Sequence, residues 1–297
     1  MSLDDHLEKF YNYISSEKGY SLNTLESYSN DLKLLSNFLE EKNKKDWGNI
    51  SIKDINEYFG NLKNQTKSTQ KRKYASIKSF FKFLEKDNQI KSNILEKIRT
   101  PKVGSPIPKP LSIKEIEKII EFKDSGQEEF TNTCVFILMY AAGLRVTEVI
   151  SIKMGEIDLD NQTVKVTGKG NKQRVLPIYS NACKSLEHYI NKVRPDLSKN
   201  KSYSSLLFVR KNLKQITRQY IWKKLKQRVL KVGINKNVTP HMIRHSFATH
   251  LLQGGASIRH VQEFLGHTSV ESTQIYTKIP NEKLIQDYNV AHPRGNK

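Results

Sequence analysis

Four segments in the first hundred residues place apolar side chains at the three- and four-residue spacing of amphipathic helices. They cover residues 4–17, 23–42, 52–62 and 68–86. Ser21, Asn23, Ser51 and Ser68 stand where helix N-caps are expected. The pattern therefore predicts a small domain of four or five helices over residues 1–100.

Residues 101–110 break this helical pattern, because they contain four prolines and one glycine. Proline also stiffens a chain into an extended form. We therefore predict a linker over residues 101–110, and a second domain over residues 111–297.

The second domain is predicted to be mainly helical with a small β-sheet. The apolar run 131–142 is typical of a core helix, whereas residues 156–159, 163–167 and 173–178 alternate like strands separated by tight turns. Other helices are predicted from Ser112 onward and over residues 147–152, 181–193, 216–232, 240–253, 257–264, 270–276 and 281–288.

The charge of the chain favours a polyanionic partner. Fifty Lys and Arg against thirty Asp and Glu give a net charge of +20. Residues 197–262 contain fourteen basic side chains and no acidic one, and residues 63–99 contain eleven basic against three acidic. A solvated helix face explains such runs poorly, because mixed charges would serve solubility as well.

Nucleic acid is a better candidate partner than a membrane. No apolar stretch approaches the roughly 18 residues of a membrane span. Residues 1–6 are polar and acidic, so they do not resemble a secretory signal, and we expect a cytoplasmic protein. The two cysteines, Cys134 and Cys183, lie in apolar helical patterns without metal-ligand spacing, and we interpret them as reduced structural thiols.

Several residues could together cleave a phosphodiester without a metal. That reaction needs a nucleophile, cations that stabilise charge on the phosphate oxygens, and an acid for the leaving oxygen. Each candidate alone also has an ordinary interpretation. Arg145 could be a surface residue, Lys169 a hairpin lysine, and His241 and Arg244 a polar helix face, while His267 could be a structural histidine and Tyr276 a core residue. The candidates are Arg145, Lys169, His241, Arg244, His267 and Tyr276.

Their order along the chain resembles the active site of the tyrosine recombinases, within the phage integrase superfamily. The flanking sequences are similar to those of the Xer group over nearly the whole chain. The similar stretches are residues 143–148, 168–172, 251–256, 265–269, 273–277 and 292–294.

The resemblance implies that Tyr276 is the nucleophile, which forms a 3′-phosphotyrosyl bond and frees a 5′-hydroxyl. It implies that Arg145 and Arg244 hold the scissile phosphate. The bond energy is kept in the phosphotyrosine, so no cofactor, metal or ATP is expected.

The remaining roles are also carried over from the family. Lys169 is expected to protonate the leaving oxygen, His241 to assist proton transfer and His267 to bind a phosphate oxygen. Glu148 is expected to orient Arg145. Met242-Ile243 departs from the usual leucine before Arg244, at a position expected to face the core.

The expected partner is double-stranded DNA, held by a C-shaped clamp of two domains. Expected DNA contacts are Lys71, Arg72, Lys73, Lys172, Arg174, Lys223 and Lys224. The resemblance implies a homo- or heterotetramer on paired sites, a possible DNA translocase activator, and a C-terminal helix at 281–288 that docks on the neighbouring protomer. That helix could instead fold back on its own domain.

Three other functions stay open at this point. A phage or mobile-element integrase shares the chemistry, although the core-binding domain here starts almost at Met1, which favours a Xer recombinase that resolves multimeric circular replicons. A type IB topoisomerase would relax DNA without exchanging strands. A DNA-binding protein without enzymatic activity would need none of the six candidate residues.

Overall fold

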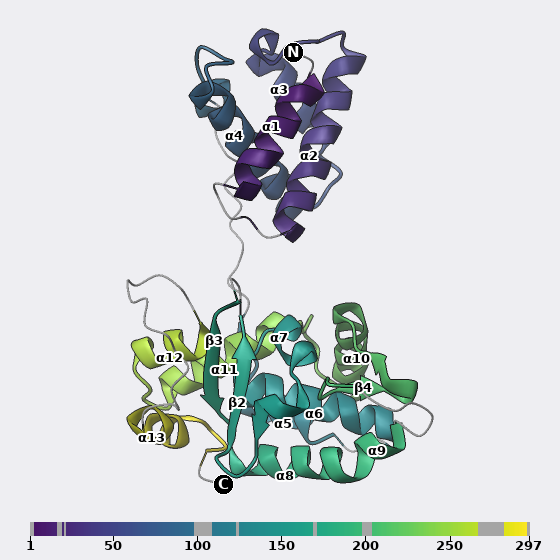
Figure 1. Cartoon of the computed structure of the whole chain (residues 1–297), viewed down its shortest axis with the longest axis vertical. Coiled ribbons are helices and arrows are strands. Elements are labelled where there is room, and N and C mark those ends of the chain that lie inside the picture. The colour runs from purple at the N-terminus through teal and green to yellow at the C-terminus, as the bar shows by residue number, and fades with distance from the viewer. Residues whose placement is uncertain are drawn as a thin grey trace. The chain divides into compact units, whose positions relative to one another are not determined.

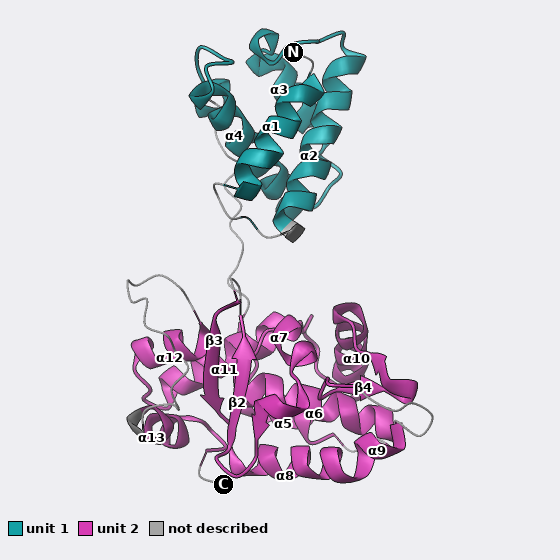
Figure 2. Ribbon diagram, viewed as in Figure 1, with its two compact units in different colours: residues 1–106 teal, residues 107–297 magenta. Residues whose placement is uncertain are grey.

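The computed structural model describes residues 3–16, 20, 22–97, 109–122, 125–168, 171–197, 204–266 and 282–295. The chain forms two compact units, residues 1–106 and 107–297, each with its own hydrophobic core (Figure 2). The structure confirms a mainly helical chain with a small sheet. Most of the predicted linker, 101–110, lies outside the described residues.

The described part of unit 1 is helical, and its helices begin close to the predicted positions. Ser51 closes a capping box with Asp54, and the side chain of Thr66, rather than Ser68, caps the fourth helix. The elements are α1 (Leu3–Ser16), α2 (Leu22–Glu41), α3 (Ile52–Asn61), α4 (Lys67–Lys86) and the short 3-10 helices Trp47–Asn49 and Ile94–Lys97.

Aromatic rings form the centre of unit 1. The ring centroid of Phe80 lies 4.7 Å from that of Trp47 and 5.2 Å from that of Phe10. The indole nitrogen of Trp47 donates a 3.1 Å hydrogen bond to the carbonyl of Leu3, which satisfies its buried polar atom. These contacts join α1 and α4 through the segment that follows α2.

Unit 2 contains short helices and two small antiparallel sheets (Figure 1). The helices are α5 (Ile113–Ile120), α6 (Gln127–Ala141), α7 (Val146–Ser151), α8 (Ser180–His188), α9 (Arg194–Leu197), α10 (Arg218–Lys231), α11 (Pro240–Gln253), α12 (Ile258–Leu265) and α13 (Glu282–Ala291). The strands are β1 (Ile157–Asp158), β2 (Thr163–Thr167), β3 (Gln173–Pro177), β4 (Val209–Arg210) and β5 (Lys214–Gln215).

The β1-β2-β3 sheet confirms the three predicted strands, whereas the β4–β5 pair was not predicted. The predicted helix 181–193 divides into α8 and a π-helical turn, Tyr189–Val193. The predicted helix 270–276 lies outside the described residues. None of the described helices has the length and apolar character needed to cross a bilayer.

Helix α6 is the centre of unit 2, because residues 134–141, after its polar first turns, are apolar and buried on every side. It packs with α5, α7, α8 and α11. The turn that leads from α6 to α7 requires Gly143, whose φ is +60°. A Cβ there would lie 2.3 Å from the ring of Phe247 in α11, so the glycine lets α7 start directly beside α11.

Helix α13 packs on its own unit. Leu284 and Tyr288 are buried, and Nδ1 of His260 in α12 lies 2.6 Å from the carboxylate of Asp287. The helix extends to Ala291, three residues beyond its predicted end. Docking of this helix on a neighbouring protomer stays a prediction.

Candidate active site

Arg145 is held at the N-terminus of α7 by Glu148, three residues later. The backbone N–H of Arg145 donates a 2.7 Å hydrogen bond to Oε2 of Glu148, and its guanidinium Nη1 donates one of 3.0 Å to Oε1. A carboxylate in the first turn of a helix also interacts favourably with the helix dipole. Glu148 thus contacts both the backbone and the guanidinium of Arg145 within one helical turn.

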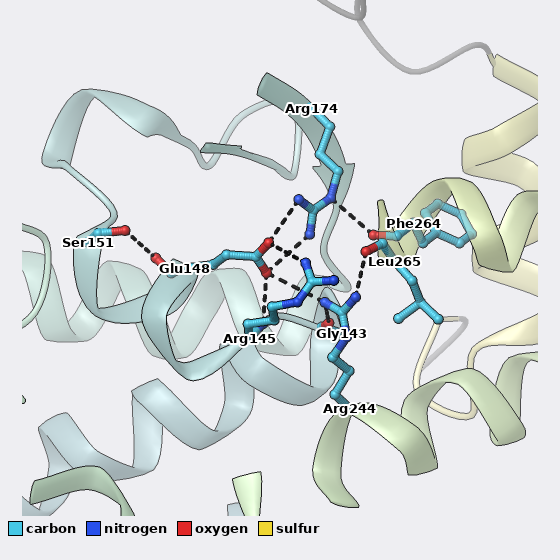
Figure 3. Close-up of polar contacts among 8 residues, drawn as sticks. All are labelled: Gly143, Arg145, Glu148, Ser151, Arg174, Arg244, Phe264 and Leu265. Atoms are coloured by element: carbon cyan, nitrogen blue, oxygen red, sulfur yellow. Dashed lines mark hydrogen bonds and ion pairs between the residues drawn. The ribbon is translucent and has the colours of Figure 1, made fainter. Parts of the chain in front are cut away.

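Glu148 is the centre of a cluster of three arginines (Figure 3). Its side chain is only 4% exposed, and it accepts hydrogen bonds from Arg145, Arg174 and Arg244. A buried carboxylate is stable only when it is paired and hydrogen-bonded. The three arginines come from different elements, α7, β3 and α11, so this one side chain joins all three.

Arg244 reaches the cluster from the first turns of α11. Pro240 occupies the first turn of that helix and the Thr239 hydroxyl caps it, as predicted. Nη1 of Arg244 donates to the carbonyl of Gly143 at 2.8 Å and to Glu148 at 3.5 Å, while Nη2 donates to the carbonyl of Leu265. The structure thus brings Arg145 and Arg244 together, although they are 99 positions apart in the chain.

The environment keeps the cluster charged. Burial by itself would raise the pKa of Glu148, but the hydrogen bond and charge of Arg174, the backbone N–H of Arg145 and the charge of Arg244 outweigh it, and the pKa is lowered. Burial and the nearby charge of Arg145 lower the pKa of Arg244 to about 10. Three arginines against one carboxylate give the cluster a formal charge of +2.

Arg174 is the member of the cluster that the sequence analysis placed elsewhere. We expected it to contact DNA, but its side chain is 13% exposed and its guanidinium donates to both carboxylate oxygens of Glu148, at 3.0 and 3.2 Å. Its Nε donates at 3.1 Å to the carbonyl of Phe264, in the last turn of α12. In this geometry Arg174 is an ion-pair partner of Glu148 within unit 2. No local sequence signal distinguishes it from the neighbouring basic residues.

Family models match both units of the chain. Residues 109–283 match the model described as "Phage integrase family", and residues 7–88 match "Phage integrase, N-terminal SAM-like domain". The chain belongs to the tyrosine recombinase, or phage integrase, family. The resemblance inferred from the motif order is thereby confirmed.

Full-length relatives place the chain in the Xer group of this family. It is 38% identical to tyrosine recombinase XerD of Oceanobacillus iheyensis, over 99% of this chain and 100% of the relative. It is 36% identical to tyrosine recombinase XerC of Herpetosiphon aurantiacus, over 98% and 96% of the two chains. The chain is a Xer-like site-specific recombinase, and therefore an enzyme.

Solved recombinase structures share the fold. A lambda integrase dimer bound to a COC′ core site superposes with a TM-score of 0.70 at 18% identity, covering 94% of this chain and 100% of that one. The XerH site-specific recombinase bound to difH in a pre-cleavage complex gives a TM-score of 0.68 at 22% identity, covering 94% and 82%. At these identities the likeness concerns the fold.

Three of the expected recombinase residues, Lys169, His267 and Tyr276, lie outside the described residues. Their described neighbours Gly168 and Gly266 lie beside the cluster, since a Cβ at either position would be 3.3 Å from Nη1 of Arg174. Gly266 also adopts φ +64° as it ends α12. His241 is exposed on α11, one turn before Arg244.

The expected DNA contacts in unit 1 separate into exposed and internal side chains. Lys71 is exposed on α4. Arg72 is partly exposed, but it donates to the buried carboxylate of Asp31. Lys73 is 4% exposed, and its Nζ lies 3.1 Å from the other oxygen of Asp31. The expectation that Lys73 faces DNA is corrected, because its ammonium pairs with the buried Asp31 carboxylate.

A similar distinction holds for the expected contacts in unit 2. Lys172 and Lys223 are exposed. Lys224 instead forms an ion pair with Glu129 of α6, which also accepts from the buried Arg228. These pairs attach α10 to α6 and leave Lys223 and its exposed neighbours on the outer face.

The described residues contain no group of three His, Cys, Asp or Glu side chains that could hold a metal ion. Cys134 and Cys183 are free and buried, and burial raises the pKa of the Cys183 thiol to about 11. A thiol of this kind is unreactive, which agrees with their interpretation as structural residues.

Proposed function

We propose that this recombinase cleaves DNA by attack of Tyr276 on the scissile phosphate, held by Arg145 and Arg244. The bond between phosphorus and the 5′-oxygen breaks as the bond to the tyrosine oxygen forms, which frees a 5′-hydroxyl. Attack by the 5′-hydroxyl of another strand reverses the step and rejoins the DNA. The observation that carries this proposal is the convergence of Arg145 and Arg244 on Glu148.

The exposure of the three arginines supports a phosphate position on one side of the cluster. The side chain of Arg145 is 35% exposed, against 13% for Arg174 and 9% for Arg244. Arg145 therefore presents its guanidinium to the substrate, and planar N–H donors match two phosphate oxygens. The excess charge of +2 suits a phosphate that gains negative charge as the phenolate attacks.

The remaining roles belong to residues that the family motif identifies. Lys169 protonates the 5′-oxygen, His241 assists proton transfer and His267 binds a phosphate oxygen. The described flanks of residues 169 and 267 lie against the same arginine cluster, which supports these assignments.

A nicked duplex that traps the covalent intermediate tests the proposal. Wild-type protein should give a covalent protein–DNA adduct on denaturing gels, in excess EDTA, whereas Tyr276→Phe should bind the duplex and give none. An adduct that persists in Tyr276→Phe would show that another residue attacks. Binding without any wild-type adduct would support a DNA-binding protein without enzymatic activity.

We further propose that the substrate is double-stranded DNA, contacted by basic side chains of both units. Solved proteins of this fold are captured on DNA, including a lambda integrase tetramer bound to a Holliday junction. A tetramer on paired sites in the cytoplasm, resolving chromosome or plasmid multimers, fits the Xer relatives. A DNA translocase activator is a further partner that the Xer resemblance implies.

Plasmid assays distinguish multimer resolution from two alternative functions. Recombination of a plasmid carrying two copies of the chromosomal site supports multimer resolution, whereas recombination only between unlike attachment sites supports an integrase. Relaxation of a supercoiled plasmid without exchange supports a topoisomerase.

A further inference from the structure

Arg174 joins three elements of unit 2 through one guanidinium group. The side chain extends from β3, its Nη1 and Nη2 donate to Glu148 of α7, and its Nε donates to Phe264 of α12. Figure 3 shows the guanidinium between the carboxylate and the end of α12. These contacts cross 26 and 90 positions of sequence, so Arg174 holds together parts of the site that local structure cannot align.

Two arginines of the cluster donate hydrogen bonds to backbone carbonyls at the end of α12. The last carbonyls of a helix have no partner within it and interact favourably with cations. Arg174 satisfies the carbonyl of Phe264, and Arg244 satisfies that of Leu265. The same two arginines donate to Glu148, so the carboxylate and the helix end are held as one rigid group.

The geometry requires an arginine. Nη1 and Nη2 of Arg174 both donate to the Glu148 carboxylate, and Nε donates to the Phe264 carbonyl. A lysine ammonium cannot form a planar fork on a carboxylate while also reaching a carbonyl. Gly168 and Gly266 leave the space for this group, because a Cβ at either would come within 3.3 Å of Nη1. All three side-chain nitrogens of Arg174 donate to oxygens of the protein itself.

We propose that Arg174 is a positioning residue for DNA cleavage, which acts through Glu148 to set the guanidinium groups of Arg145 and Arg244. Glu148 accepts two of its hydrogen bonds from Arg174. Without Arg174, Glu148 would be hydrogen-bonded only to Arg145 and Arg244, the two residues whose guanidinium groups it positions. Arg145 then loses the fixed geometry in which it meets the phosphate.

The test compares Arg174→Gln and Arg174→Lys with wild type, and it rests on the proposed cleavage by Tyr276. The single-turnover rate of adduct formation at saturating nicked duplex should fall about a hundredfold in Arg174→Gln, because misplacement by about 1 Å costs that much. DNA affinity should stay close to wild type. Arg174→Lys should restore little of the rate, since it keeps the charge and loses the fork.

A double-mutant cycle with Glu148→Gln shows whether Arg174 acts through that carboxylate. The double variant Glu148→Gln with Arg174→Gln should cleave no more slowly than the slower single variant. The proposal would be overturned if the rate losses of the two single variants multiplied in the double variant. A wild-type cleavage rate in Arg174→Gln would also overturn it. Loss of affinity with an unchanged saturating rate would identify Arg174 as a direct DNA contact and equally overturn it.

Arg194→Lys is the matched control. Arg194 also donates from a forked guanidinium to backbone carbonyls, those of Ser204, Leu206 and Leu207, outside the Glu148 cluster. This variant should cleave at the wild-type rate. If thermal unfolding shows that Arg174→Gln does not fold, Arg174→Lys replaces it in the rate measurement and in the double-mutant cycle. A wild-type protein that forms no adduct would refute the cleavage proposal itself. Failure of that proposal is therefore distinguishable from failure of the proposed role of Arg174.

Discussion

The hydroxyl of Tyr288 donates a 2.8 Å hydrogen bond to the backbone carbonyl of Ala141. This contact joins the C-terminal helix α13 to the end of the central helix α6. Tyr288 is fully buried, and its ring stacks on His292 with centroids 5.0 Å apart. The C-terminal segment of this recombinase therefore belongs to the core of unit 2.

Substitutions at Tyr288 should lower the free energy of unfolding. Tyr288→Ala removes a buried aromatic ring, and such changes cost about 3–5 kcal/mol. Tyr288→Phe keeps the ring and leaves the Ala141 carbonyl without its partner, at a cost of about 1–3 kcal/mol. Denaturant unfolding measures both. Val290→Ala on the same helix is the control, because Val290 is 73% exposed and should change stability by less than about 0.5 kcal/mol.

Docking of α13 on a neighbouring protomer needs a test that spares this core. Truncation after Pro280 would remove Tyr288 and disturb folding first, so the exposed Val290 is the better position. Val290→Asp should bind a half site normally, bind a full site with less cooperativity and recombine a two-site plasmid poorly. Normal cooperativity and recombination in this variant would indicate that α13 serves its own unit.

Arg145→Lys should be a severe change. The variant keeps the charge and loses the two-pronged donor, and loss of one such transition-state donor costs roughly 3–4 kcal/mol, about a hundredfold to a thousandfold in rate. Single-turnover cleavage of the nicked duplex measures the effect. A rate near wild type would exclude Arg145 as the residue that holds the phosphate.

DNA binding should depend strongly on salt. If about six to ten phosphates are contacted, affinity falls ~10³–10⁵-fold between roughly 50 and 200 mM salt. Two neighbours on α10 form a matched pair: Lys223→Gln should reduce the salt slope by about one, whereas Lys224→Gln should leave it unchanged because Lys224 pairs with Glu129. Equal effects of the two variants would contradict the assignment from the structure.

Glu148 should make the stability of unit 2 depend on pH in the acid range. Its pKa is lowered in the folded protein, so the unfolded chain binds the proton more readily. The contribution to stability is fully present above the ordinary value of 4.5 and is lost as pH falls through the lowered pKa. Acid titration of unfolding should show a shallower slope in this window for Glu148→Gln. Identical slopes would contradict the assignment.

Local chemistry in the sequence predicted most elements and the family. Helix starts follow from caps that act within four residues, such as Ser51, Ser112 and Thr239, and the mostly apolar run 131–142 predicted the core helix α6. The strands β4 and β5 were missed because two residues each show no alternation. Identification of Arg145 and Arg244 as partners came from the order of motifs, and contact between them required the fold.

The sequence by itself determined where most helices begin, which residues are candidates for the chemistry and that the chain is basic, because these follow from short-range geometry, motif order and composition. Only the tertiary structure decided which basic side chains are internal. Lys71 and Lys73 lie in one basic run, as do Lys172 and Arg174, yet Lys73 is buried and Arg174 is mostly covered, whereas Lys71 and Lys172 are exposed. The physical reason is that Asp31 and Glu148 are buried by contacts between segments far apart in the sequence. A buried carboxylate must be paired, and its partner is the basic side chain that the fold places beside it.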